Sequence, residues 1–410
     1  MHFKKLYTSL FLFIVFIIVF FAKKNFSGEL YQDEYHYLPT AILFSHEPIP
    51  SLDLLKNYDE LNTPLPFILG GWVVNIFGAD IANLRLLTFC TSFLLLMIFV
   101  WFSPERSKRY FLCLGGLLLF PNYYLCSVFY YTDIFALISV LAGIVAYLKR
   151  IHWLSAICFI AAISCRQYML AFPAAMVAFE LLGMLKKSEN IRHFLTKIFS
   201  DLTWLYYVVA ILSLVPWILL WNGPAPAKTM AYQHYDSHQL ISYNFGFVLY
   251  SSVCLAVYYV IPEVIITRKI RYFFDYPRNN PALFITLLAI VILLVVFFPA
   301  KQAHNPYFTW PYLGYIDQLF TLVGITGFVK QICFGAFMLI TLMRFISPIF
   351  NLASFVVVIN ILLLGKAQLS WDKYSLPTIM VLWFLAMFDN QWSLYDDHAL
   401  NKREALKMKQ

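Results

Sequence analysis

Long apolar runs, separated by short segments rich in Lys and Arg, repeat along this chain and limit what it can fold into. The first run, residues 6–22, carries no charged residue and is long enough to cross the hydrocarbon core of a bilayer as a helix. Over the whole chain 61% of the residues are hydrophobic and 13% are charged, whereas a typical soluble domain is about 25% charged. So little charge cannot cover a water-facing surface, so the sequence predicts an all-α, polytopic membrane protein.

We expect about 12 transmembrane helices, because each needs about 20 apolar residues. The candidate spans are 6–22, 85–103, 110–124, 132–148, 152–164, 167–184, 203–221, 241–264, 281–299, 318–342, 346–364 and 376–389. The first run is interpreted as a span rather than a cleaved signal, because the segment AKKNFSG that ends it lacks a small-residue cleavage pattern.

The basic residues sort to one side of this arrangement. The basic segments are MHFKK, SPERSKR, LKR, KKSENIRHFLTK, TRKIRYFFDYPRNN and NKREALKMK. The positive-inside rule makes that side cytoplasmic, so the net charge of +8 reports orientation rather than a nucleic-acid partner. The opposite side receives the loops 23–84, 125–131, 165–166, 222–240, 300–317 and 365–375. We therefore predict one membrane domain over residues 1–390 and a short cytoplasmic tail, 391–410.

The first outer loop, 23–84, is unusually long and is divided by several prolines. Its apolar stretch, residues 67–77, is too short to span and contains Gly70, Gly71 and Asn75. We expect this stretch to lie along the membrane interface as a short helix.

Carboxylates gather where this loop begins. Asp33, Glu34 and His36 lie together in the segment DEYH. They could be solvated side chains at the end of a helix, or one carboxylate could be a general base whose pKa is tuned by low-dielectric surroundings. Adjacent residues point in different directions, so we expect only one of Asp33 and Glu34 to face a substrate. This spacing does not readily supply a metal site, and we expect no metal.

The other outer loops add polar groups, each with an ordinary structural alternative. Asp133 could simply cap a helix, and Arg166 could snorkel to the interface or bind phosphate through paired hydrogen bonds. The candidates from these loops are Tyr131, Asp133, Arg166, Gln167, Asn222, Lys228, His238, His304 and Lys373. Carboxylates, cations and aromatic rings on one face of the bilayer suit an anionic lipid headgroup attached to a sugar.

In order along the chain, these segments resemble the motifs of the GT-C glycosyltransferases. More narrowly, they are similar to the alpha-1,2-glucosyltransferases that add the terminal glucose to the dolichol-linked oligosaccharide. The resemblance covers nearly the whole chain and rests on DEYH (33–36), NTPLPFIL (62–69), FYYTD (129–133), CRQ (165–167), WNG with SHQ (221–239) and LSWDKYSLP (369–377). Two departures are Tyr168 where the family has Thr after Arg-Gln, and KQAHNPY (301–307) in place of a more basic outer motif.

The resemblance implies a GT-C fold and inverting transfer of a hexose, glucose by preference, from a polyprenyl-phosphate sugar to a hydroxyl of a lipid-linked glycan or other acceptor. It implies Asp33 as the base, with Glu34 as the alternative. Donor contacts would come from Arg166, Gln167, Lys228, His238 and Lys373. Other site contacts would come from His36, Tyr131, Asp133, Asn222 and His304. No cofactor is implied.

Several alternatives stay open. A mannosyl-, arabinosyl- or protein O-glycosyltransferase of the same fold class would present similar loops. A lipid or solute transporter is the main alternative from another class, although its spans would be expected to hold ionisable groups and its halves to repeat. The membrane would be the endoplasmic reticulum in a eukaryote or the cytoplasmic membrane in a prokaryote, with the site on the lumenal or periplasmic face.

Overall fold

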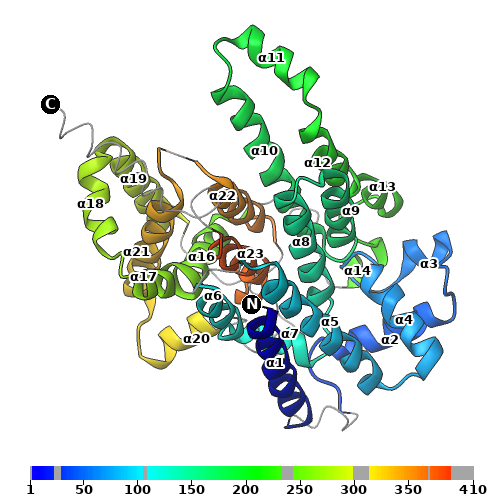
Figure 1. The fold of residues 1–410 in the computed structure, drawn as a ribbon. Coiled ribbons are helices and arrows are strands. Elements are labelled where there is room, and N and C mark those ends of the chain that lie inside the picture. Colours follow the sequence, from blue (N-terminus) through cyan, green and yellow to red (C-terminus); the bar gives the residue numbers. More distant parts are fainter. Residues whose placement is uncertain are drawn as a thin grey trace. The chain divides into compact units, whose positions relative to one another are not determined.

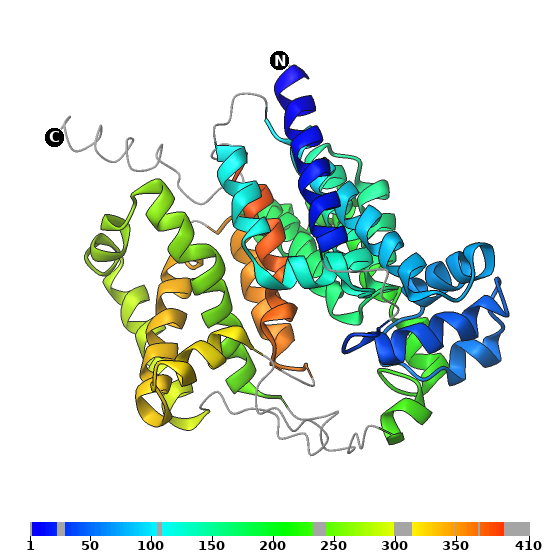
Figure 2. The same ribbon diagram turned by 90° about the horizontal axis from the view of Figure 1, so that it is seen from below.

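The computed structural model describes residues 2–22, 29–104, 109–232, 243–298, 314–348, 350–367 and 370–388. In these ranges every regular element is a helix and none is a strand, as two perpendicular views show (Figure 1 and Figure 2). The predicted all-helical class is therefore confirmed for the described part of the chain. The predicted site residues His238 and His304, and the tail 391–410, lie outside the described residues.

Several described helices are long and apolar enough to cross a membrane. Six qualify alone, and the number rises to eight if two bent pairs each count as one span. The six are Lys4–Phe21, Ile81–Phe102, Gln167–Lys186, Thr203–Trp221, Phe245–Thr267 and Gly327–Phe345. The bent pairs are Tyr110–Leu118 with Pro121–Val128, and Arg271–Asn279 with Pro281–Phe297. These helices indicate an integral, multi-pass membrane protein, while the larger number of about 12 spans stays a prediction.

Some predicted spans correspond to apolar helices that are short. Asp133–Leu148, His152–Ile163 and Leu352–Leu364 are helical but have 16, 12 and 13 residues, respectively. The predicted span 318–342 was wrong at its start. The chain forms a separate helix up to Leu322 and begins the next at Gly327, because Gly324 and Gly327 both adopt positive φ angles that break a right-handed helix.

Contacts between residues group the chain into two compact units. The first comprises Met1–Phe102 and Pro121–Ser242, and the second comprises Ser103–Phe120 and Tyr243–Gln410. The prediction of a single domain over residues 1–390 stays a prediction, because this grouping does not decide whether the units fold together.

The first unit holds most of the predicted site. In it, α8 packs along α9, α10 packs along α12, and α2 packs on α4 (Figure 1). Its helices are α1 (His2–Ala22), α2 (Glu34–Ser45), α3 (Leu52–Asn57), α4 (Leu65–Phe77), α5 (Ile81–Phe102), α7 (Pro121–Val128), α8 (Asp133–Leu148), α9 (His152–Ile163), η1 (Gln167–Leu170), α10 (Ala171–Lys186), α11 (Ile191–Ser200), α12 (Thr203–Leu212), α13 (Val215–Trp221) and α14 (Ala227–Tyr232).

The close packing of α2 on α4 depends on a glycine. A Cβ atom added at Gly71 would lie 2.8 Å from the backbone carbon of Phe44, closer than real Cβ atoms come. The expected short helix over residues 67–77 is present as α4, and its Phe67 and Val74 are buried while Trp72 and Phe77 are exposed. An exposed apolar face beside a buried one fits the expectation of an interfacial helix, whose position in the bilayer stays a prediction.

The second unit is built around α16, α19 and α21, which pack on one another (Figure 2). Its helices are α6 (Arg109–Leu118), α16 (Phe245–Leu255), η2 (Ala256–Val260), α17 (Ile261–Thr267), α18 (Arg271–Asn279), α19 (Pro281–Phe297), α20 (Tyr315–Leu322), α21 (Gly327–Phe345), α22 (Leu352–Leu364), η3 (Asp372–Ser375) and α23 (Leu376–Leu385). A single π-helical turn, η2, joins α16 to α17 just before Pro262.

Candidate functional site

A buried guanidinium organises the polar cluster of the first unit. Arg166 lies between α9 and η1 in extended backbone, and only 6% of it is exposed. Its Nη2 donates to Asp133 Oδ2 at 2.5 Å, and its Nη1 donates to Asn62 Oδ1 at 2.6 Å. Nη2 also donates to the hydroxyl of Tyr37 at 3.4 Å. Asp133 therefore pairs with Arg166 at the start of α8, rather than capping that helix as the ordinary interpretation held.

Asp33 lies at the start of α2 within the same cluster. Its carboxylate makes no capping hydrogen bond to α2, and it accepts a long bond of 3.4 Å from the hydroxyl of Tyr37. The side chain is half-buried. The preceding residue, Gln32, has a φ of 45°, which non-glycine residues rarely adopt. Its side-chain oxygen accepts a hydrogen bond from Tyr131 at 2.9 Å, which helps to hold this backbone and hence Asp33 in place.

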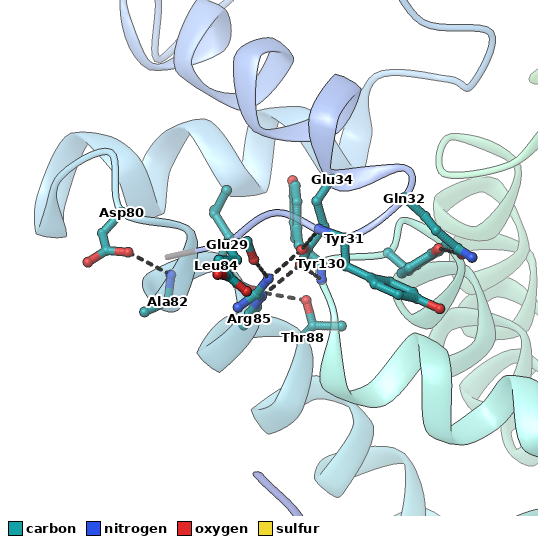
Figure 3. A network of polar contacts seen from close by, with 11 residues as sticks. Glu29, Tyr31, Gln32, Glu34, Asp80, Ala82, Leu84, Arg85, Thr88 and Tyr130 are labelled. Atoms are coloured by element: carbon teal, nitrogen blue, oxygen red, sulfur yellow. Dashed lines mark hydrogen bonds and ion pairs between the residues drawn. The ribbon is translucent and has the colours of Figure 1, made fainter. Parts of the chain in front are cut away.

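Glu34 is buried in a network of its own (Figure 3). Arg85 of α5 donates to both of its carboxylate oxygens, from Nε at 2.9 Å and from Nη2 at 2.6 Å. Backbone N–H groups of Tyr31 and Tyr130 each donate at 2.8 Å. Four donors thus surround a carboxylate that is 0% exposed, so Glu34 fastens the start of α2 to α5 and to the loop before α8.

The loop between α3 and α4 is tied to two distant segments. Thr63 donates its hydroxyl to the carbonyl of Ile163, and the Gln167 side chain donates to the carbonyl of Leu61 at 2.6 Å. From the WNG segment, the Trp221 indole donates at 2.8 Å to the carbonyl of Leu55, which lies in α3 just before the loop. Asn222 follows in the left-handed conformation that ends α13, and its side chain is exposed. Residues about 100 to 170 positions apart in the chain are therefore joined around one loop.

This loop also carries a buried acid, Glu60, of which 7% is exposed. No hydrogen bond to its carboxyl is found among the residues that the structure describes. Burial raises the pKa of Glu60 from 4.5 to about 8, and the charges of Asp33 and Asp59 add to the rise while Arg166 opposes it. Glu60 is therefore mostly protonated at neutral pH.

The remaining predicted residues are distributed more widely. His36 is exposed on α2, and Tyr131 is buried with its hydroxyl on Gln32. Lys228 is 65% exposed and pairs at 2.8 Å with Asp59 at the rim of the same loop. Lys373 belongs to the second unit, where its ammonium lies 4.2 Å from the centre of the Trp371 ring.

The second unit has a buried acid beside Lys373. Asp372 accepts hydrogen bonds from the hydroxyls of Tyr250, at 2.5 Å, and Tyr258, at 2.7 Å. The backbone N–H of Ile316 donates to it at 3.3 Å. Burial raises the pKa of Asp372, and these hydrogen bonds oppose the rise. Neutral donors satisfy this carboxyl, so it fastens η3 to α16 and to the start of α20.

The cluster around Arg166 can support acid–base chemistry. Asp33 provides a partly accessible carboxylate, and Glu60 provides a carboxyl that holds its proton near neutral pH. Within the described residues, no group of three or more His, Cys, Asp and Glu side chains is placed to hold a metal ion. The expectation that the reaction needs no metal stays a prediction.

The sequence analysis did not single out Glu60, Arg85, Asn62 or Tyr37. Arg85 stood at the predicted start of a span, where a basic residue is ordinary. Glu60 was one of two adjacent acids in a proline-broken loop, and no signal in the sequence distinguished it from the exposed Asp59. Asn62, by contrast, lies in NTPLPFIL, which the resemblance had already marked.

A scan against protein-family models finds no match for this chain, and searches of curated proteins and of solved structures find none either.

Proposed function

We propose that this chain is a GT-C-type inverting glycosyltransferase. It moves a hexose, with glucose as the preferred candidate, from a polyprenyl-phosphate sugar to a hydroxyl acceptor such as a lipid-linked glycan. One observation carries the proposal. Separate segments that resemble family motifs come together in the first unit: Arg166 of 165–167 contacts Asn62 of 62–69 and Asp133 of 129–133, and it is linked to Asp33 of 33–36 through Tyr37. Chemistry at a membrane surface needs such a convergence of distant loops.

Asp33 is the proposed base. As the acceptor oxygen attacks the anomeric carbon, its proton moves to the Asp33 carboxylate, and the bond from the anomeric carbon to the phosphate oxygen breaks. The lipid phosphate leaves as an anion and needs no proton, unlike the leaving group of an inverting glycoside hydrolase. Glu34 is less suited to this role, because four donors already occupy its buried carboxylate.

The leaving phosphate needs cations near its oxygens. Lys228 is an accessible cation of the first unit and is the proposed phosphate contact there. Lys373, which is 2% exposed in the second unit, and His238 and His304 stay proposed contacts on the resemblance alone. Arg166 faces inward onto Asp133 and Asn62, which supports a role in holding Asp33 and its neighbours rather than in direct phosphate binding. His36, Tyr131, Gln167 and Asn222 remain proposed contacts for donor or acceptor.

A transporter is the second candidate, and one observation favours it. Glu263 and Arg344 are buried in two candidate spans of the second unit and form paired hydrogen bonds of 2.6 and 2.7 Å. Intramembrane ionisable groups often mark transport pathways. Because each charge here is matched by the other, the pair also serves to join α17 to α21, which needs no transport function.

The deciding experiment is a transfer assay on purified protein in detergent. Polyprenyl-phosphate glucose and polyprenyl-phosphate mannose are offered separately, with the Asp33→Asn variant and EDTA in parallel. We expect transfer or slow hydrolysis of one donor, lost at least about 100-fold in the variant and unchanged by EDTA. No turnover of either donor by protein shown to be folded would refute the proposal, and turnover retained by Asp33→Asn would move the base elsewhere.

A further inference from the structure

The proposed mechanism leaves the buried acid Glu60 without a role. Buried polar groups in folded proteins are almost always hydrogen-bonded, and a group that is not calls for an explanation. Glu60 is 7% exposed, and its carboxyl has no hydrogen-bond partner among the described residues. Its carboxyl oxygens are not among the fully buried, unpaired side-chain atoms of the described residues, so they keep some contact with the outside and a ligand can reach them.

The groups that face Glu60 come from several places in the first unit. Asp33 at the start of α2 and the neighbouring Asp59 repel a charge on it, and Arg166 after α9 attracts one. Tyr58 of the same loop and Tyr130 before α8 lie close enough to sense its charge. The Arg166 guanidinium is already paired with another carboxylate at the start of α8, so the balance of charge around Glu60 favours its neutral form.

We propose that Glu60 acts as a neutral carboxylic acid that hydrogen-bonds a hydroxyl of the sugar bound beside Asp33. This inference rests on the proposed function. A protonated carboxyl offers one O–H donor and an acceptor oxygen, and a sugar hydroxyl can use both. A second negative charge at this place would repel an anionic lipid phosphate, whereas a neutral acid does not.

The same chemistry separates Glu60 from the base. A carboxyl that already holds its proton at neutral pH cannot accept another from the acceptor hydroxyl. Asp33 lies at the surface of the cluster and is the carboxylate that can accept that proton. The two acids thus have different roles. Asp33 accepts the proton of the acceptor hydroxyl, and Glu60 positions the sugar.

The test compares Glu60→Gln and Glu60→Ala with Asp59→Asn, which removes the adjacent but 63% exposed carboxylate. Wild-type kcat/KM for transfer should fall above about pH 8 as Glu60 ionises. Glu60→Gln keeps a neutral donor and acceptor, so it should stay within about threefold of wild type and lose that alkaline fall. Glu60→Ala should raise KM about tenfold, the value of one hydrogen bond. Asp59→Asn should keep the alkaline fall but move it to lower pH, because the charge of Asp59 contributes to the raised pKa of Glu60.

Two outcomes would overturn the inference. Loss of turnover in Glu60→Gln would make Glu60 a base or a charged contact, and an alkaline fall that persists in Glu60→Gln would assign the titration to another group.

A measurement without turnover separates this inference from the proposed function. Infrared spectra at pH 7 should show a protonated carboxyl band in the wild type that disappears in Glu60→Gln and persists in Asp59→Asn. If that band is found but neither lipid-phosphate sugar is turned over, the proposed function fails while the neutral acid stands. If the band is absent, the inference fails even where transfer is observed.

Discussion

The buried pair of Glu34 and Arg85 should be a principal source of stability at the start of α2. Exposure is 0% for the Glu34 side chain and 2% for that of Arg85, and their closest atoms are 2.6 Å apart. Replacing Glu34 with Gln removes the charge and turns an NH₂ group towards other donors, whereas replacing Arg85 with Met leaves a buried anion. Removing one partner of a buried ion pair costs about 3–5 kcal/mol, and we expect this range for each single variant.

The double variant distinguishes the pair from its surroundings. Glu34→Gln with Arg85→Met leaves no unpaired charge, and the introduced glutamine would still offer one oxygen to the N–H groups of Tyr31 and Tyr130. We therefore expect the double variant to lose about 2–3 kcal/mol less than the sum of the two single variants. Because the backbone bonds remain, the double variant should still fold.

Unfolding in mixed detergent micelles, followed by fluorescence of the ten tryptophans, measures these differences. The control is Asp59→Asn, which breaks an ion pair whose partners are 63% and 65% exposed and should cost less than about 1 kcal/mol. Additive single variants, or a cost for Glu34→Gln no greater than that of the control, would show that the pair does not stabilise the fold as argued.

Three further predictions follow from the same contacts. Gly71→Ala should lower the free energy of unfolding by about 1–3 kcal/mol because its Cβ would clash with the backbone of α2, while Gly115→Ala, whose Cβ meets open space, should be neutral or stabilising in the same micelle titration. Arg166→Met should lower the free energy of unfolding by about 3–5 kcal/mol, because it removes the guanidinium that pairs with the buried Asp133. Arg166→Lys should recover less than half of that loss in unfolding measurements, because one ammonium cannot make the paired hydrogen bonds of a planar guanidinium. Because the pKa of Glu60 rises from 4.5 to about 8 on folding, the folded state holds this proton more tightly than the unfolded state. The resulting stabilisation is fully present below pH 4.5 and is lost as the pH rises through about 8, so the free energy of unfolding should fall by about 5 kcal/mol at most. Unfolding midpoints from pH 5 to 9 should therefore fall more steeply for the wild type than for Glu60→Gln, and parallel curves would contradict the assignment.

The helical class and most helix positions could be predicted because apolar runs and their interruptions are local properties of the sequence. The long helices α1, α5 and α10 coincide with predicted spans to within a few residues. The start of α21 was missed because an apolar segment continues through Gly324, and hydropathy does not report a backbone turn. Span number depends on how short helices such as α9 are placed in a bilayer, which is not a property of local sequence.

The candidate site could be predicted in part because polar residues are rare in this chain and so are conspicuous. Asp33, Asp133 and Arg166 were singled out for that reason, and all three lie in one cluster. What could not be predicted was the division of roles, because it depends on partners distant in sequence. Arg85 and Tyr130 lie 51 and 96 residues from Glu34, and their hydrogen bonds make one of two adjacent acids a structural residue.

The same reasoning applies within the loop that carries Asp59 and Glu60. The two residues are adjacent acids. Asp59 is 63% exposed and pairs with Lys228, whereas Glu60 is 7% exposed and has no hydrogen bond from the described residues. Both acids lie between Tyr58 and Asn62, and the hydroxyl of Tyr58 donates to the carbonyl of Asn62 at 2.5 Å across this segment. A largely buried acid with no hydrogen bond from the described residues, next to a carboxylate that repels its charge, is well suited to hydrogen-bond a hydroxyl that reaches it. This is the physical reason to look for the sugar site at this loop first.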